Sequence, residues 1–204
     1  MSAIEIKQRP FMTCPELFQD VPAFIAEILA RRGVASTQEL ELKLKHLLAP
    51  SMKGLNEAIR LMDAAIDQEH KIVIVGDYDA DGATSTALMI LALREMGAQV
   101  EYLVPDRFKY GYGLTPAIAD LAFTSFTPDL LITVDNGISS HDGVKQAQDH
   151  GMQVIISDHH LTTKPTPSAQ AVVNPNQVGC DFPSKALAGG GVAFYVLANL
   201  STYR

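Results

Sequence analysis

The chain has 204 residues and a formal net charge of −7, with 47% hydrophobic and 19% charged residues. This composition allows a sizeable core and excludes extensive disorder. It argues against a protein that holds nucleic acid through a basic surface alone. Aspartates gathered at a metal site would raise the acidic count, however, so charge leaves the partner undecided. No apolar run approaches the roughly 18 residues that cross a bilayer, and the N-terminus lacks the layout of a secretory signal.

The first 70 residues predict an N-terminal helical segment. Apolar residues between Val21 and Leu29 follow a 3.6-residue period, and Gly33 supplies a stop. A second helix is predicted at 36–48, closed by Pro50, and a third at 55–68. The apolar face of the third helix contains Leu55, Ile59, Met62 and Ile66. No site chemistry is visible here, so residues 1–70 are expected to pack against a following domain or guide its substrate.

From residue 71 the pattern alternates between strand and helix. Strands are predicted at 71–76, 99–104, 129–134, 152–157 and 171–173. Helices are predicted at 83–96, 116–123 and 140–150, and another begins near Gly191. The segment 71–76 is apolar and β-branched, which is typical of a strand buried on both faces. Residues 71–204 therefore predict an α/β domain with a doubly wound, mainly parallel sheet of about five strands and flanking helices.

Acidic residues and histidines follow three of these strands. The first strand leads into GDYDADG, the third into DNG and the fourth into SDHH. The carboxyl ends of parallel strands meet at one crevice, where ligands bind. We therefore expect one site containing Asp77, Asp79, Asp81, Asp135, Asn136, Asp158, His159 and His160.

This residue set indicates metal chemistry. So many carboxylates cannot all ionise in a partly buried crevice without a counter-charge. Oxygen ligands with one or two imidazoles suit Mn²⁺ or Mg²⁺ better than zinc. Two such ions about 3.5–4 Å apart would activate a water and neutralise a scissile phosphate. The pattern predicts phosphoester hydrolysis.

Each cluster has an alternative explanation. An EF-hand loop would need Glu at its twelfth position, where this chain has Leu88, and a helix before it. The DNG segment alone could be a turn, and His159 and His160 alone could be helix-cap or surface residues. Cys14 and Cys180 fit no metal or redox spacing and predict reduced, structural thiols in a cytoplasmic protein. The other histidines are expected to be structural or solvated: His46, His70, His141 and His150.

The ordered motifs resemble those of the DHH phosphoesterases. GDYDADG, DNG and SDHH look like the first three motifs of that family, while LLAPSMKGL, PDRFKYGYGL, NPNQ and LAGGGVAFYV resemble its RecJ branch. The likeness runs from about residue 40 to the end of the chain. It implies a 5′-to-3′ exonuclease of recombination and repair that acts on single-stranded DNA. It also implies single-strand-binding protein and a helicase as partners.

The resemblance also implies residue roles. Asp77 and Asp79 would bind two separate metals, and Asp135 would bridge them. His159 would be a further metal ligand, with His160 against the scissile phosphate and Asp158 orienting the imidazoles. Many relatives carry a histidine where this chain has Val75. Asp81 is expected as a ligand that could compensate, or else that metal would bind more weakly.

Substrate contacts are expected mainly from PDRFKYGYGL. Cationic side chains there can hold phosphates and aromatic ones can stack bases, although an ordinary glycine-rich loop would look similar. The glycines of LAGGGVAF could bring amides to a phosphate or allow close helix packing. Asn174 could orient a ligand or cap a turn. The expected substrate-binding residues are Arg107, Tyr112, Asn136 and Asn174.

Two other functions are compatible with these motifs. A DHH hydrolase of small substrates, such as an oligoribonuclease, cyclic-dinucleotide phosphodiesterase or pyrophosphatase, would share the metal site. A non-catalytic DHH-fold DNA-binding scaffold would usually lose site residues that are intact here.

The family's fourth motif supplies another metal-binding Asp after the helix near Gly191, and the sequence ends at Arg204 before one. We therefore expect a truncated chain with weak activity or none.

Overall fold

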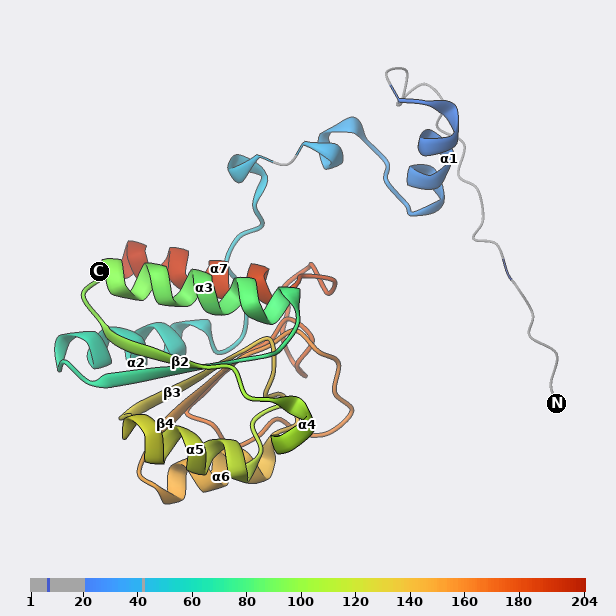
Figure 1. Ribbon diagram of the computed structural model, residues 1–204. Coiled ribbons are helices and arrows are strands. Elements are labelled where there is room, and N and C mark those ends of the chain that lie inside the picture. Colours follow the sequence, from blue (N-terminus) through green and yellow to red (C-terminus); the bar gives the residue numbers. More distant parts are fainter. Residues whose placement is uncertain (1–6, 8–20, 42) are drawn as a thin grey trace, which may run out of the picture. The chain divides into compact units, whose positions relative to one another are not determined.

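The computed structural model describes residues 7, 21–41 and 43–204, and the chain divides into two compact units (Figure 1). The units are Met1–Ala49 and Pro50–Arg204. The helix predicted at 55–68 thus belongs to the same unit as the sheet. The division lies about one helix before the expected boundary at residue 70.

The first unit contains α1 (Ala23–Arg31), which confirms the first predicted helix, and Gly33 follows it with a φ of +82°. The helix predicted at 36–48 is wrong. In its place are two short 3₁₀ helices, η2 (Thr37–Leu40) and η3 (Leu44–His46). Four leucines of this segment are exposed, so they supply no buried apolar face that would offset the cost of ordering a longer helix. These leucines are Leu40, Leu44, Leu47 and Leu48.

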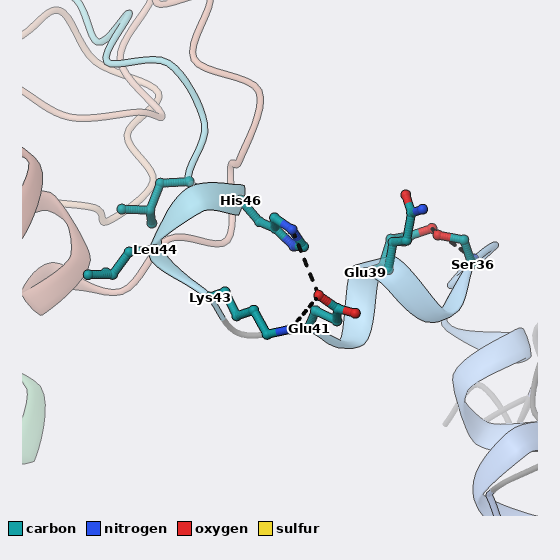
Figure 2. Close-up of a pocket in the computed structure, with 8 residues that line it drawn as sticks. Ser36, Glu39, Glu41, Lys43, Leu44 and His46 are labelled. Atoms are coloured by element: carbon teal, nitrogen blue, oxygen red, sulfur yellow. Dashed lines mark hydrogen bonds and ion pairs between the residues drawn. The ribbon is translucent and has the colours of Figure 1, made fainter.

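A pocket of about 610 Å³ lies within this unit, lined by residues between Ser36 and Leu47. Figure 2 shows Glu41 in it, facing Lys43 and His46. An oxygen of Glu41 lies 3.0 Å from Nζ of Lys43 and 3.8 Å from Nε2 of His46. The described lining residues bring no group of metal ligands together, so the chemistry expected from the sequence lies elsewhere.

The second unit is built on a five-stranded sheet in the order β2-β1-β3-β4-β5, with every neighbouring pair parallel. This confirms the predicted doubly wound α/β fold. The strand bounds agree with the predicted ones to within one residue: β1 Lys71–Gly76, β2 Gln99–Leu103, β3 Leu130–Val134, β4 Gln153–Ser157 and β5 Ala171–Val173.

Helices cover both faces of the sheet (Figure 1). On one face lie α2 (Leu55–Asp67), α3 (Ala80–Glu95) and α7 (Gly189–Tyr203), and on the other lie α5 (Pro116–Phe126) and α6 (His141–Asp149). Alternate residues of β1 supply the two cores: Ile72 and Ile74 pack with the first group, and Val73 and Val75 with the second. The central strands β1 and β3 are therefore buried on both sides, as their apolar sequences predict.

Two local differences bear on the site. Helix α3 begins at Ala80 instead of residue 83, because Asp79 caps it by accepting a hydrogen bond from the Gly82 amide at 3.0 Å. Asp81 therefore lies in the first helical turn and not in the loop. In addition, PDRFKYGYGL contains the short helix α4 (Arg107–Tyr110), capped by Asp106.

Cys180 is buried, and its sulfur accepts a hydrogen bond from the amide of Lys53 at 3.5 Å. The other cysteine, Cys14, lies outside the described residues. Within 21–41 and 43–204, no helix has both the length and the apolar character needed to cross a membrane.

Candidate metal centre

The site lies where three neighbouring strands end together. Gly76 of β1 pairs with Val134 of β3, which pairs with Ser157 of β4. Each of these aligned residues is followed at once by an aspartate, so the sheet register itself brings Asp77, Asp135 and Asp158 to one edge. The convergence expected from the sequence is present.

Carboxylates form the first group of ligand atoms. Oxygens of Asp77, Asp79 and Asp135 all lie within 4.8 Å of one another. Asp77 and Asp135 are buried, whereas Asp79 is exposed. An all-oxygen set of this kind suits Mg²⁺ or Mn²⁺.

A second group shares Asp135 with the first. It consists of Asp135, His159 and His160, again with ligand atoms within 4.8 Å of one another. Nε2 of His159 lies 3.1 Å from Oδ1 of Asp135 and 3.7 Å from Oδ2 of Asp81. Asp135 thus belongs to both groups of possible ligand atoms.

The loop that carries Asp135 is held in an uncommon conformation. Asp135 has a φ of +63°, in the left-handed region that few residues other than glycine adopt. Asn136 stabilises the loop because its Nδ2 donates to the carbonyls of Val75 at 3.1 Å and Val134 at 2.9 Å. The hydroxyl of Thr133 donates to the Asn136 carbonyl at 2.7 Å. Observed strain with this much support is typical of functional sites.

The electrostatics of Asp135 fit a bound cation. Burial, followed by the charges of Asp81 and Asp79, raises the pKa of Asp135 to about 7. Its Oδ1 is buried, and no described residue offers it a hydrogen bond of acceptable geometry. A divalent ion would supply both the missing partner and the counter-charge. The site residues therefore fit a metal.

One fixed cation already lies beside the cluster. Nη2 of Arg107 donates to Oδ1 of Asp77 at 2.7 Å, and the amide of Tyr78 donates to the same oxygen at 2.7 Å. The pKa of Asp79 is lowered, mainly by the hydrogen bond from the Gly82 amide. The hydrogen bond from Gly82 thus favours the ionised form of Asp79, which a metal needs.

Asp158 holds the histidine pair. Its Oδ1 accepts hydrogen bonds from the amides of His159 at 2.7 Å and His160 at 3.1 Å, and lies 2.7 Å from Nδ1 of His160. Burial opposes ionisation of Asp158, but hydrogen bonds from His160 and the Ile138 amide outweigh it and keep its pKa below the ordinary value. The contact with Asp158 in turn raises the pKa of His160. Asp158 thus orients the imidazole of His160.

Three of the expected site residues form hydrogen bonds with backbone groups of the chain. Asp81 accepts hydrogen bonds from the amides of Gly189 at 2.7 Å and Gly190 at 2.8 Å, at the start of α7. Two amides of the glycine run therefore bind a carboxylate of the chain itself. Asn136 and Asn174 are both buried, and the Nδ2 of each donates to backbone carbonyls.

A cavity of about 260 Å³ adjoins His160. Tyr112 lines it, with a hydroxyl 3.3 Å from Nε2 of His160, and burial raises the pKa of Tyr112 so that the hydroxyl stays protonated. The segment 137–140 forms another wall, which local sequence patterns did not indicate. Phe108 of α4 is 95% exposed, so its ring is free to contact a ligand.

Comparison with known proteins agrees with this geometry. Residues 71–204 match the model of the DHH family, N-terminal domain. The chain belongs to the DHH family. Over 202 residues, this DHH protein is 45% identical to the single-stranded-DNA-specific exonuclease RecJ of Escherichia coli (strain K12), covering 98% of the chain and 35% of that relative. It is 51% identical over 168 residues to the RecJ of Haemophilus influenzae, covering 81% of the chain and 29% of that relative.

Solved structures similar to this chain include RecJ exonucleases. A crystal structure of exonuclease RecJ bound to manganese superposes with a TM-score of 0.69 and 37% identity, covering 77% of this chain and 40% of that one. RecJ of Thermus thermophilus in complex with Mn²⁺ gives a TM-score of 0.70 and 33% identity, covering 86% and 24%. The chain spans about a third of the length of the curated relatives it matches.

Proposed function

We propose that this chain carries the two-metal centre of an exonuclease that hydrolyses single-stranded DNA from its 5′ end. The observation that carries the proposal is the position of Asp135, whose carboxylate belongs to both groups of ligand atoms. The relatives named above are single-stranded-DNA-specific exonucleases, which favours DNA over the small substrates of other DHH hydrolases. The three motifs GDYDADG, DNG and SDHH are intact, which disfavours the scaffold alternative.

Mn²⁺ or Mg²⁺ would occupy the centre. In our proposal Asp77, Asp79 and Asp135 hold one ion, while Asp135 and His159 hold the other, with Asp81 beside His159 as a further candidate. This assignment differs from the family-based expectation that Asp77 and Asp79 bind separate metals, because their oxygens lie in one group with Asp135. When bound, the two ions would supply a nucleophilic hydroxide and neutralise charge on the phosphate.

The surrounding side chains fit a phosphodiester substrate. His160 keeps Nδ1 on Asp158, and its raised pKa favours the protonated ring, which can donate from Nε2 to a phosphate oxygen. Arg107 can contact a neighbouring phosphate, and Tyr112 and Phe108 can stack on bases. The cavity beside His160 is lined by uncharged groups apart from Asp158 and His160 themselves, which suits a nucleoside better than a second phosphate.

Protein partners and location complete the proposal. Single-strand-binding protein and a helicase are expected from the RecJ resemblance, as is a cytoplasmic location. Residues 71–204 are proposed as the catalytic domain, with the helical residues before them packing or guiding substrate.

The test compares substrates in the presence of Mn²⁺. The longest protein carrying this sequence is incubated with 5′-ended single-stranded DNA, duplex DNA and dinucleotides, beside its Asp135→Asn variant. We expect mononucleotide release from single-stranded DNA, lost in the variant. Faster cleavage of dinucleotides than of single-stranded DNA would support a small-substrate hydrolase instead. No effect of Asp135→Asn would contradict the proposed metal centre.

A further inference from the structure

The peptide groups of His159 and His160 are all satisfied by side chains. Strand β4 ends at Ser157, just before these residues. The two amides donate to Oδ1 of Asp158, as described above. The two carbonyls accept hydrogen bonds from asparagines: Nδ2 of Asn176 donates to His159 at 2.5 Å, and Nδ2 of Asn174 donates to His160 at 3.1 Å.

The two asparagines are also tied to each other. The amide of Asn176 donates to Oδ1 of Asn174 at 2.7 Å, and Nδ2 of Asn176 donates to the carbonyl of Lys185 at 3.1 Å. Asn174 is fully buried. Its oxygen is engaged by Asn176 and its nitrogen by His160, and its burial keeps it from a substrate. A substrate-binding role for Asn174 would require this arrangement to break.

The loop that carries the asparagines is itself braced. Nζ of Lys185 donates to the carbonyls of Pro175 at 2.6 Å and Cys180 at 2.8 Å. Gln177 fixes the loop to another part of the unit, because its Nε2 donates to the carbonyls of Val172 at 2.7 Å and Lys53 at 3.1 Å. Lys185 and Gln177 thus brace the loop separately, and neither contacts a histidine, so the loss of one brace leaves the other in place.

We propose that Asn174 and Asn176 are positioning residues that clamp the His159–His160 backbone through its carbonyls, while Asp158 binds its amides. The imidazoles project from a segment beyond the end of the β4 ladder, so their placement depends on these side-chain contacts. Removing the donor of Asn176 would let the His159 carbonyl turn toward water and shift the ring attached to the same residue. The functional consequence of this clamp rests on the proposed metal centre. The geometry of the clamp does not, because its hydrogen bonds are present in the metal-free chain.

The test uses Asn176→Ala with Gln177→Ala as its matched control. Both changes remove a side-chain amide that donates to two carbonyls, but only Asn176 contacts a histidine. The first measurement is the set of imidazole chemical shifts of His159 and His160 in metal-free, isotope-labelled protein at fixed pH. The second is the affinity for Mn²⁺ by calorimetry, with circular dichroism to confirm folding.

We expect Asn176→Ala to shift the signals of both imidazoles and to weaken Mn²⁺ binding by about 10–100-fold, as loss of an outer-shell partner does. Gln177→Ala should leave the imidazole signals in place and change the affinity less than about twofold. Unchanged signals and affinity in folded Asn176→Ala would overturn the clamp, as would equal effects of the two variants. If Asn176→Ala does not fold, the variant Asn176→Ser, which has a shorter side-chain donor, is used in its place. It is compared with Gln177→Ala by the same two measurements. If the unmodified chain does not bind Mn²⁺, the proposed function is contradicted. The imidazole chemical shifts then test the clamp by themselves.

Discussion

The carboxylate of Asp81 in α3 accepts a hydrogen bond from the amide of Gly189, the first residue of α7, at 2.7 Å. The next amide, that of Gly190, donates to the other oxygen at 2.8 Å. An acidic side chain from one helix thus caps the N-terminus of a second helix more than a hundred residues later. The same carboxylate lies 3.7 Å from His159, so helix packing and the metal centre share one group.

Asp81→Ala is therefore expected to destabilise the metal-free chain. It removes two hydrogen bonds to orphan amides and a favourable charge at the α7 N-terminus, which together contribute about 1–2 kcal/mol to the free energy of unfolding. Urea denaturation measures the change. Thr84→Ala on the same helix is the control, because the Thr84 hydroxyl bonds only to carbonyls of its own helix. An equal loss in both variants would show that the interhelical cap contributes nothing.

Gly189→Ala is expected to damage the metal centre directly. A Cβ at this position would lie 2.4 Å from Oδ1 of Asp135, so the proposed bridging carboxylate would have to move. Mn²⁺ affinity should fall by at least about tenfold. At Gly190 the nearest atom to a Cβ is Oδ1 of Asp81 at 3.3 Å, so Gly190→Ala should cause a smaller loss. Calorimetric titration of the two variants gives the comparison, and undiminished binding by Gly189→Ala would contradict the assignment of Asp135.

Arg107→Met should weaken DNA binding more than metal binding. Arg107 is the cation bound to Asp77 and a proposed phosphate contact. Its removal should reduce affinity for single-stranded DNA about tenfold and lower the slope of log affinity against log salt by about 0.7. Fluorescence anisotropy at several salt concentrations measures both quantities. Lys145→Met is the control, because Lys145 pairs with Asp149 on α6 and should affect neither. A slope unchanged by Arg107→Met would exclude a phosphate contact.

The stability of the metal-free chain should fall as pH rises, whereas the stabilisation by Mn²⁺ should grow. The pKa of Asp135 is raised to about 7 in the folded, metal-free chain, above its unfolded value of about 4. The folded state therefore binds the proton more tightly, so Asp135 contributes stability that is present below about pH 4 and is lost as pH rises toward 7. His160, whose pKa is also raised, acts in the same direction as pH rises further.

Mn²⁺ competes with that proton, so its stabilising effect should grow as pH rises through about 7. Thermal denaturation between about pH 5 and about pH 8, with and without Mn²⁺, checks both trends. Asp135→Asn should flatten the metal-free trend. A melting temperature that rises with pH in the metal-free chain would contradict the raised pKa.

Local patterns were sufficient to predict the sheet and the position of the site. The apolar segment Lys71–Gly76 has the composition of a fully buried strand, and its observed bounds agree with the predicted ones. Parallel strand ends must meet at one edge, so Asp77, Asp135 and Asp158 could be placed together before their contacts were known.

Contacts between distant segments were not predictable in the same way. The cap between Asp81 and Gly189 joins residues 108 positions apart, and no periodicity in either segment signals it. The histidine carbonyls depend on Asn176, which follows β5 in an irregular loop. The predicted helix at 36–48 failed for the converse reason, because the described leucines of this segment are exposed and supply no buried face to stabilise it.

The most direct test of the two-metal centre is the anomalous diffraction of Mn²⁺ in crystals of this chain. We expect one peak within coordination distance of Asp77, Asp79 and Asp135, and a second within coordination distance of Asp135 and His159, about 3.5–4 Å from the first. Both peaks should disappear or weaken in Asp135→Asn. Peaks that avoid Asp135, or no peak at this edge of the sheet at saturating Mn²⁺, would contradict the two-metal centre.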